Sequence, residues 1–325
     1  MTPIRPRRLR AHPLLRDMVA GVRLSPKDFI APLFVRLGEK IKNPIVSMPG
    51  VFQMSPEIAV AELKRLQQLG LPAFILFGIA DKNKKDALGS HAHDPNNAVC
   101  TTLKMAKDAG INMLAITDLC YCEYTDHGHC GPLTPQRTVD NDATIQRLGT
   151  QAVVHARAGA DVVAPSGMMD NAVAAIREAL DADKHADTSI LAYAVKYASA
   201  FYGPFRDAAE SAPSSGDRKT YQMDYRTSAR DAIREARIDE AQGADMIMVK
   251  PGIAYLDILR DVTDAVAVPT AVYQVSGEYA MIKAAAANGW IDEKAIALET
   301  MTAFKRAGAS VILTYHAAQL AEWLR

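Results

Sequence analysis

The sequence has neither a net charge nor a long apolar run. Its 37 lysine and arginine residues balance its 37 aspartate and glutamate residues, so no overall electric field favours nucleic acid or a membrane as a partner. No hydrophobic stretch approaches the roughly 20 residues that a transmembrane helix needs. These absences argue against a membrane protein and against a nucleic-acid-binding protein, and they make the cytoplasm the expected location.

Cysteine is scarce but clustered. Of four cysteines in 325 residues, three fall within eleven residues: Cys120, Cys122 and Cys130. This clustering predicts thiolate metal ligation rather than a disulfide framework. Three thiolates suit Zn²⁺ and leave one coordination position open, as catalytic zinc sites do. A closed structural site that uses His127 or His129 as a fourth ligand is the alternative.

The chain also lacks the Gly-x-Gly-x-x-Gly motif of dinucleotide-binding folds. Short apolar runs instead alternate with amphipathic helical stretches such as 58–69 and 229–242. Eight runs are predicted to be strands: 30–35, 73–77, 113–117, 161–164, 190–195, 246–249, 270–274 and 311–315. This alternation predicts an α/β fold, a TIM (β/α)8 barrel over residues 29–325, with a doubly wound sheet as the alternative.

Two segments fall outside this pattern. Residues 1–28 are rich in proline and arginine and are followed by no hydrophobic signal core, which predicts an ordered arm that contacts a neighbouring subunit. Residues 197–225 form the longest stretch with no predicted element, and a loop of this length in a barrel is usually a lid. Arg206 and Arg218 in this lid could bind a carboxylate through paired hydrogen bonds. That they are ordinary solvated loop arginines is an equally good interpretation.

Two predicted strands end in a lysine. Lys250 closes an apolar strand just before Pro251 and Gly252, and Lys196 closes another. Desolvation lowers the pKa of such an amine and frees a nucleophile, and two amines in one pocket disfavour charge on each other. The pair therefore predicts Schiff-base chemistry on carbonyl substrates. If only one such lysine were present, the better interpretation would be an ordinary structural residue, with its stem packed on the strand and its amine in water.

Polar residues interrupt the strands only at their carboxyl ends, where barrel active sites are built. They are Asp118, Ser166, Lys196, Lys250, Ser276 and Tyr315. Each alone could be a capping or turn residue, but their joint placement predicts an active site. Asp118, next to the cysteine cluster, is the candidate for proton transfer.

Seven motifs carry a resemblance to a known family. They are 48–51 (MPGV), 118–131 (DLCYCEYTDHGHCG), 139–142 (VDND), 164–166 (APS), 201–206 (FYGPFR), 248–252 (MVKPG) and 273–279 (YQVSGEY). Over nearly its whole length the chain resembles the porphobilinogen synthase, or 5-aminolevulinate dehydratase, family. The resemblance implies a TIM barrel with an N-terminal arm, assembled as a homo-octamer. It also implies the condensation of two 5-aminolevulinate molecules to the pyrrole porphobilinogen.

The resemblance also assigns roles to residues. It makes Lys250 and Lys196 the Schiff-base lysines and the three cysteines the ligands of a catalytic zinc ion. Two carboxylate clamps follow, one for each substrate molecule: Arg206 with Arg218, and Ser276 with Tyr315. Ser166 and Gln222 are also predicted to bind substrate. Glu235 matches an allosteric Mg²⁺ ligand, although nearby arginines on its helix would allow an ordinary ion pair instead.

Two other functions compete with this prediction. A metal-independent Schiff-base aldolase on the same barrel needs one strand-end lysine, but it leaves the cysteines and the second lysine without a role. A zinc-stabilised scaffold or RNA-binding protein would use the basic arm, but the balanced charge disfavours it.

Overall fold

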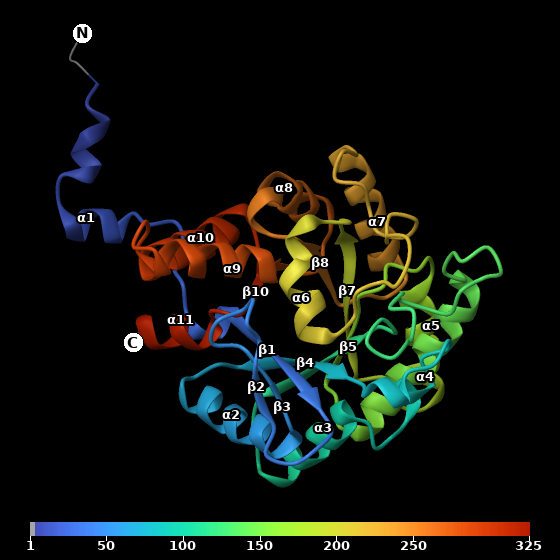
Figure 1. The fold of residues 1–325 in the computed structure, drawn as a ribbon. Coiled ribbons are helices and arrows are strands. Elements are labelled where there is room, and N and C mark those ends of the chain that lie inside the picture. Colours follow the sequence, from blue (N-terminus) through green and yellow to red (C-terminus); the bar gives the residue numbers. More distant parts are fainter. Residues whose placement is uncertain (1–3) are drawn as a thin grey trace.

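Eight parallel strands close into a barrel in the structure, a computed structural model that describes residues 4–325. Figure 1 shows the fold. The strands are β1 (Phe29–Arg36), β4 (Ala73–Ile79), β5 (Leu114–Leu119), β6 (Val162–Pro165), β7 (Ser189–Lys196), β8 (Met246–Lys250), β9 (Thr270–Gln274) and β10 (Val311–Thr314). Each pairs with its neighbours in the chain, and β10 pairs with β1 through Phe29 opposite Ile312. The predicted TIM barrel is confirmed, and each predicted strand agrees to within two residues.

Helices surround the barrel and connect its strands (Figure 1). They are α2 (Pro56–Gln68), α3 (Ala98–Asp108), α4 (Asn141–Ala158), α5 (Ala172–Ala182), α6 (Gly203–Ala209), α7 (Ala229–Ala241), α8 (Leu256–Ala265), α9 (Ser276–Ala287), α10 (Glu293–Ala307) and α11 (Ala317–Trp323). Glycines in the left-handed region end several of these helices. Gly159 after α4 and Gly308 after α10, with φ of 108° and 113°, turn the chain into the next strand at little steric cost.

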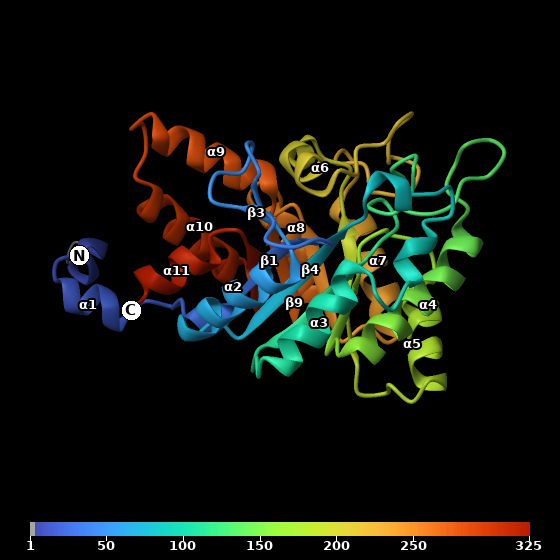
Figure 2. The ribbon, with the colours of Figure 1, turned by 60° about the horizontal axis from the view of Figure 1, so that its bottom comes forward.

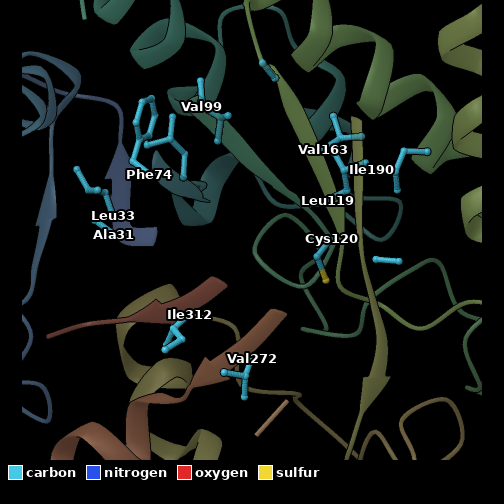
Figure 3. Close-up of a cluster of buried hydrophobic side chains, with 14 of the residues drawn as sticks. Ala31, Leu33, Phe74, Val99, Leu119, Cys120, Val163, Ile190, Val272 and Ile312 are labelled. Atoms are coloured by element: carbon cyan, nitrogen blue, oxygen red, sulfur yellow. The ribbon is translucent and has the colours of Figure 1, made fainter. Parts of the chain in front are cut away.

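Alternate residues of the regular strands face two different cores. In β4, for example, Ile75 and Phe77 point into the barrel, whereas Phe74 and Leu76 pack against the surrounding helices. Figure 3 shows part of this outer core, with Phe74, Leu33 and Ile312 among its labelled residues. The barrel interior is filled by side chains, so reactive groups reach solvent only at an end of the barrel.

Strand β7 breaks this alternation. Its pairing with β8 changes register between Ala192 and Val195, and both of these residues face the outer core. Tyr193 faces the barrel interior before the irregularity, and Lys196 lines a cavity inside the barrel after it. The irregularity therefore brings two residues three positions apart onto one face, which strict alternation would not.

The N-terminal arm leaves the barrel, as Figures 1 and 2 show. It contains a 3₁₀ turn (Pro6–Arg10) and helix α1 (Pro13–Met18). Leu14 and Met18 are 65% and 77% exposed, so these apolar side chains of the arm are not buried against its own barrel. The 3₁₀ turn and helix α1 thus extend away from the barrel, whereas Leu24, later in the predicted arm, packs against the outer core. Residues 1–3 of the arm lie outside the described residues.

Two features were not predicted. A short hairpin, β2 (Lys42–Pro44) and β3 (Phe52–Met54), extends the sheet beside the end of β1. The predicted lid is also not an irregular loop throughout, because it contains a 3₁₀ turn (Ala200–Tyr202) and helix α6.

Candidate active site

Lys196 and Lys250 lie side by side at the carboxyl ends of adjacent strands. They are register partners in the parallel pairing of β7 with β8, so both side chains point to the same face at the same height. Each is only 5% exposed, and both line one cavity. The prediction that the two lysines share a pocket is confirmed.

The two amines have different surroundings. Lys196 Nζ donates a hydrogen bond to the Ser166 carbonyl. Lys250 Nζ instead lies over aromatic rings, the nearest of which is Tyr273, with 4.3 Å between the nitrogen and the ring centroid. Burial and the charge of Lys196 lower the pKa of Lys250 to about 7. A neutral Lys250 amine is therefore available as a nucleophile near neutral pH.

The three clustered thiols meet beside this cavity. The sulfur atoms of Cys120, Cys122 and Cys130 all lie within 4.8 Å of one another, and none of the three residues is more than 2% exposed. Three thiolates on one tetrahedral zinc ion stand about 3.8 Å apart, so this spacing fits zinc. Hydrogen bonds from the other two thiols hold the pKa of Cys130 well below its usual value.

The nearby histidines point their ring nitrogens at other groups. His127 Nδ1 accepts from the backbone N–H of His129 and its Nε2 donates to the Ala87 carbonyl, at 3.1 and 3.2 Å. His129 Nε2 donates to the Ser215 carbonyl at 2.9 Å, which leaves its Nδ1 to accept from Tyr221 at 3.1 Å. Because both rings use both nitrogens, neither is placed to be a fourth metal ligand.

Two buried carboxyl groups border the thiols and the lysines. Burial and the nearby Glu123 carboxyl raise the pKa of Asp118 to about 7, so this group can both give and take a proton near neutral pH. Glu123 is 3% exposed and contacts the Cys122 sulfur at 3.1 Å. Glu123 was not predicted from the sequence, where it is one of two acidic residues, with Asp126, between Cys122 and Cys130.

The lid, residues 197–225, covers the cavity that holds the two lysines. Arg206 and Arg218 both line it, together with Asp118 and Ser166. Arg218 is buried and donates to the carbonyls of Gly128 and Ser211 at 3.0 and 2.8 Å, which fastens the lid to the cysteine loop. The remaining space is about 20 Å³, room for about one water molecule. Substrate can enter only if the lid moves.

The second predicted clamp lies outside this cavity. Ser276 Oγ accepts a hydrogen bond from the backbone N–H of Phe205 at 2.9 Å, and the Tyr315 hydroxyl bonds that of Tyr273 at 2.7 Å. Tyr315 borders a separate cavity of about 400 Å³ between the β2–β3 hairpin and helices α2 and α11. Phe205 contacts Ser276 directly, but it is linked to Tyr315 only through Phe34, on which its ring packs and which stacks on Tyr315. Phe205 also lines the cavity that holds the two lysines.

Two further predicted residues lie away from the lysines. Gln222 and Glu235 border a pocket next to the lid. Glu235, on α7, stands among carboxylates rather than beside an arginine partner: burial and the charges of Asp170 and Asp231 raise its pKa. Burial and Glu235 likewise raise the pKa of Asp239 to about 7. The ordinary arginine pairing expected as the alternative is thus not what surrounds Glu235.

The fold and the cavity define a barrel enzyme that sets two buried lysines beside three thiols. Comparison with known proteins identifies the family. The profile of the family described as delta-aminolevulinic acid dehydratase matches residues 3–323. The delta-aminolevulinic acid dehydratase of Synechocystis sp. is 53% identical over 325 residues, covering 99% of this chain and 98% of the relative. That of Synechococcus elongatus is 51% identical over 323 residues, covering 98% of each chain.

A solved structure agrees with these sequence relatives. Delta-aminolevulinic acid dehydratase (porphobilinogen synthase) from Toxoplasma gondii, in complex with the product porphobilinogen, superimposes with a TM-score of 0.96 at 44% identity. The match covers 99% of this chain and 91% of that one. This chain belongs to the delta-aminolevulinic acid dehydratase family, and it is an enzyme of the lyase class. No helix in residues 4–325 is both long and apolar enough to span a membrane.

Proposed function

We propose that this chain condenses two 5-aminolevulinate molecules to porphobilinogen, using Lys250 and Lys196 as the two imine-forming residues. The observation that carries the proposal is the pair of adjacent, buried, register-matched lysines in one cavity. Each amine can hold one ketone substrate, and the same cavity keeps both close enough to react. Incubation with 5-aminolevulinate and a colour assay for the pyrrole tests it. An aldolase has no use for the second lysine or the three thiols.

The surroundings of the lysines support an order of events. Lys250, with the lowered pKa, attacks the first ketone, and water leaves as the imine forms. Lys196, whose amine is held by the Ser166 carbonyl, takes the second substrate. Asp118 lies in the cavity with both and relays protons during the bond-forming steps. The closed lid excludes water that would hydrolyse the imines.

We propose that Cys120, Cys122 and Cys130 hold a catalytic zinc ion. The support is the fit of three buried thiols to zinc and the engagement of His127 and His129 elsewhere. When bound, zinc supplies a Lewis acid with an open coordination position. Arg218 would add a positive charge next to the thiolates and join the cysteine loop to the lid.

We also propose a regulatory Mg²⁺ site at Glu235 and a homo-oligomer formed through the N-terminal arm. Glu235 with Asp170 and Asp239 offers the oxygen ligands that Mg²⁺ prefers, and a bound cation would offset their mutual repulsion. The N-terminal arm, with its exposed apolar residues, supports a homo-oligomer in which arms pack on neighbouring subunits, and an octamer is the assembly proposed.

The two clamps are expected to respond differently to mutation. Arg206→Ala removes a charge-assisted pair of hydrogen bonds to the carboxylate of the second substrate only. Borohydride trapping of one substrate on Lys250 should therefore survive while condensation fails. Tyr315→Phe removes a hydroxyl donor to the first substrate, at a cost of about 1 to 3 kcal/mol, and should weaken trapping itself. Arg218→Ala is less informative than Arg206→Ala, because Arg218 also anchors the cysteine loop. Equal loss of trapping in Arg206→Ala and Tyr315→Phe would show that the division into two sites is wrong.

Imine formation should follow the titration of Lys250. The neutral amine is the nucleophile, so a pKa lowered to about 7 means that the trapping rate rises with pH through about 7 and levels off above it. A solvated lysine would continue to gain reactivity up to about pH 10.4. Single-turnover trapping between pH 5.5 and 9 decides between the two, and a rate still climbing at pH 9 would contradict the assigned environment of Lys250.

A further inference from the structure

Four aromatic rings surround the amine of Lys250. From Nζ to the ring centroids the distances are 4.3 Å for Tyr273, 5.1 Å for Tyr202, and 5.2 Å for both Tyr193 and Phe205. The nitrogen lies over each ring, within the distance of about 6 Å at which a ring face attracts a cation. Such groups of rings bind ammonium cations in other proteins.

The rings come from two parts of the molecule. Tyr193 on β7 and Tyr273 on β9 belong to the barrel wall and are 1% and 0% exposed. Tyr202, in the 3₁₀ turn, and Phe205, on α6, belong to the lid. The barrel thus provides a permanent half of the ring cluster, and the lid provides the other half when it lies over the cavity.

A cation at this nitrogen needs this kind of support. Burial removes water, and the charge of Lys196 on the next strand repels a second positive charge. Lys196 itself is supported by the Ser166 carbonyl. Once Lys250 has become an imine, its nitrogen keeps at most one N–H, so directional hydrogen bonds can do little to stabilise it. Ring faces need no N–H and can act on the whole C=N⁺ group.

We infer that Tyr193, Tyr202, Phe205 and Tyr273 form a cation cage that stabilises the protonated imine on Lys250, and that closing the lid completes the cage. In the step concerned, the Lys250 amine adds to the ketone carbon, a proton converts the resulting hydroxyl into water, and water leaves to give C=N⁺–H. The lid then does more than exclude water, because it adds two rings that favour the reactive cation. The inference rests on the proposed imine at Lys250.

The test varies the charge distribution of one ring without changing its shape. Tyr273→Phe is the reference, and phenylalanines carrying one, two or five fluorines at position 273 weaken the ring face in steps. The readout is the 5-aminolevulinate concentration that gives half-maximal cyanoborohydride trapping on Lys250. Across the series this concentration should rise in proportion to ring weakening, by roughly 2- to 30-fold in total. The same fluorinated residues at Phe74, a buried ring of the outer core, are the control and should change nothing.

The fluorinated series separates failure of the cage from failure of the imine at Lys250. A flat series at position 273, or an equal shift at Phe74, overturns the cage while leaving the imine at Lys250 in place. No trapping in the unaltered protein overturns the proposed function and the cage with it. If the fluorinated Tyr273 series does not fold, the same series at Phe205 carries the test, because Phe205 lies on the half-buried lid helix. A graded rise there supports the cage, and a flat response contradicts it.

Discussion

Replacing Lys250 with methionine is expected to abolish pyrrole formation, with a loss of turnover on the order of 10³-fold or more, because the nucleophile is removed. The fold should be kept. Methionine retains the apolar stem in the barrel wall, and the buried amine that it replaces is costly to desolvate. Pyrrole formation measures the first effect, and a thermal melt measures the second.

Lys64→Met is the matched control, since this lysine lies on the exposed face of α2. It should leave both turnover and melting temperature unchanged. Lys196→Met should block condensation but still allow one substrate to be trapped on Lys250. A Lys250→Met enzyme that turns over at more than a few per cent of the original rate would remove this residue from the mechanism.

Loss of a thiol from the cysteine cluster is expected to have the second-largest effect. Cys122→Ala, or chelation of the wild-type protein, should lower turnover by at least roughly 100-fold, because the three-thiol site no longer holds its metal. Adding Zn²⁺ should restore the chelated protein but not the variant. The zinc content, measured by mass spectrometry, and the activity should be determined together for the chelated protein and for the variant.

Cys100→Ala provides the control for this experiment. Cys100 is also a buried free cysteine, but it lies on α3 and is not one of the grouped thiols. The variant should keep its metal and its activity. A chelated protein that retains full rate would exclude a catalytic metal, and one that unfolds on chelation would indicate a structural site instead.

Much of the fold is predictable because its signals are local. Short apolar runs between helical stretches locate all eight barrel strands, and glycines such as Gly159 and Gly308 mark where helices turn into strands. The lysine pair is predictable for the same reason: each residue ends its own strand, and parallel strands end at the same edge of the barrel. The cysteine cluster is visible from spacing alone.

The rest depends on contacts that the sequence does not show. Tyr193 and Lys196 share a face only because β7 has an irregular register, and strict alternation places them on opposite faces. Tyr202 and Phe205 reach Lys250 through the lid, whose short helix is held by tertiary packing rather than by a strong helical pattern. The β2–β3 hairpin is too short to carry a periodic signal.

The most direct test of the central claim is to reduce the protein with borohydride in the presence of 5-aminolevulinate and to map the product by peptide mass spectrometry. We expect one substrate, joined as a secondary amine, on the peptide that contains Lys250, and no such adduct in Lys250→Met. Adducts found only on exposed lysines, with the Lys250 peptide unmodified, would contradict it.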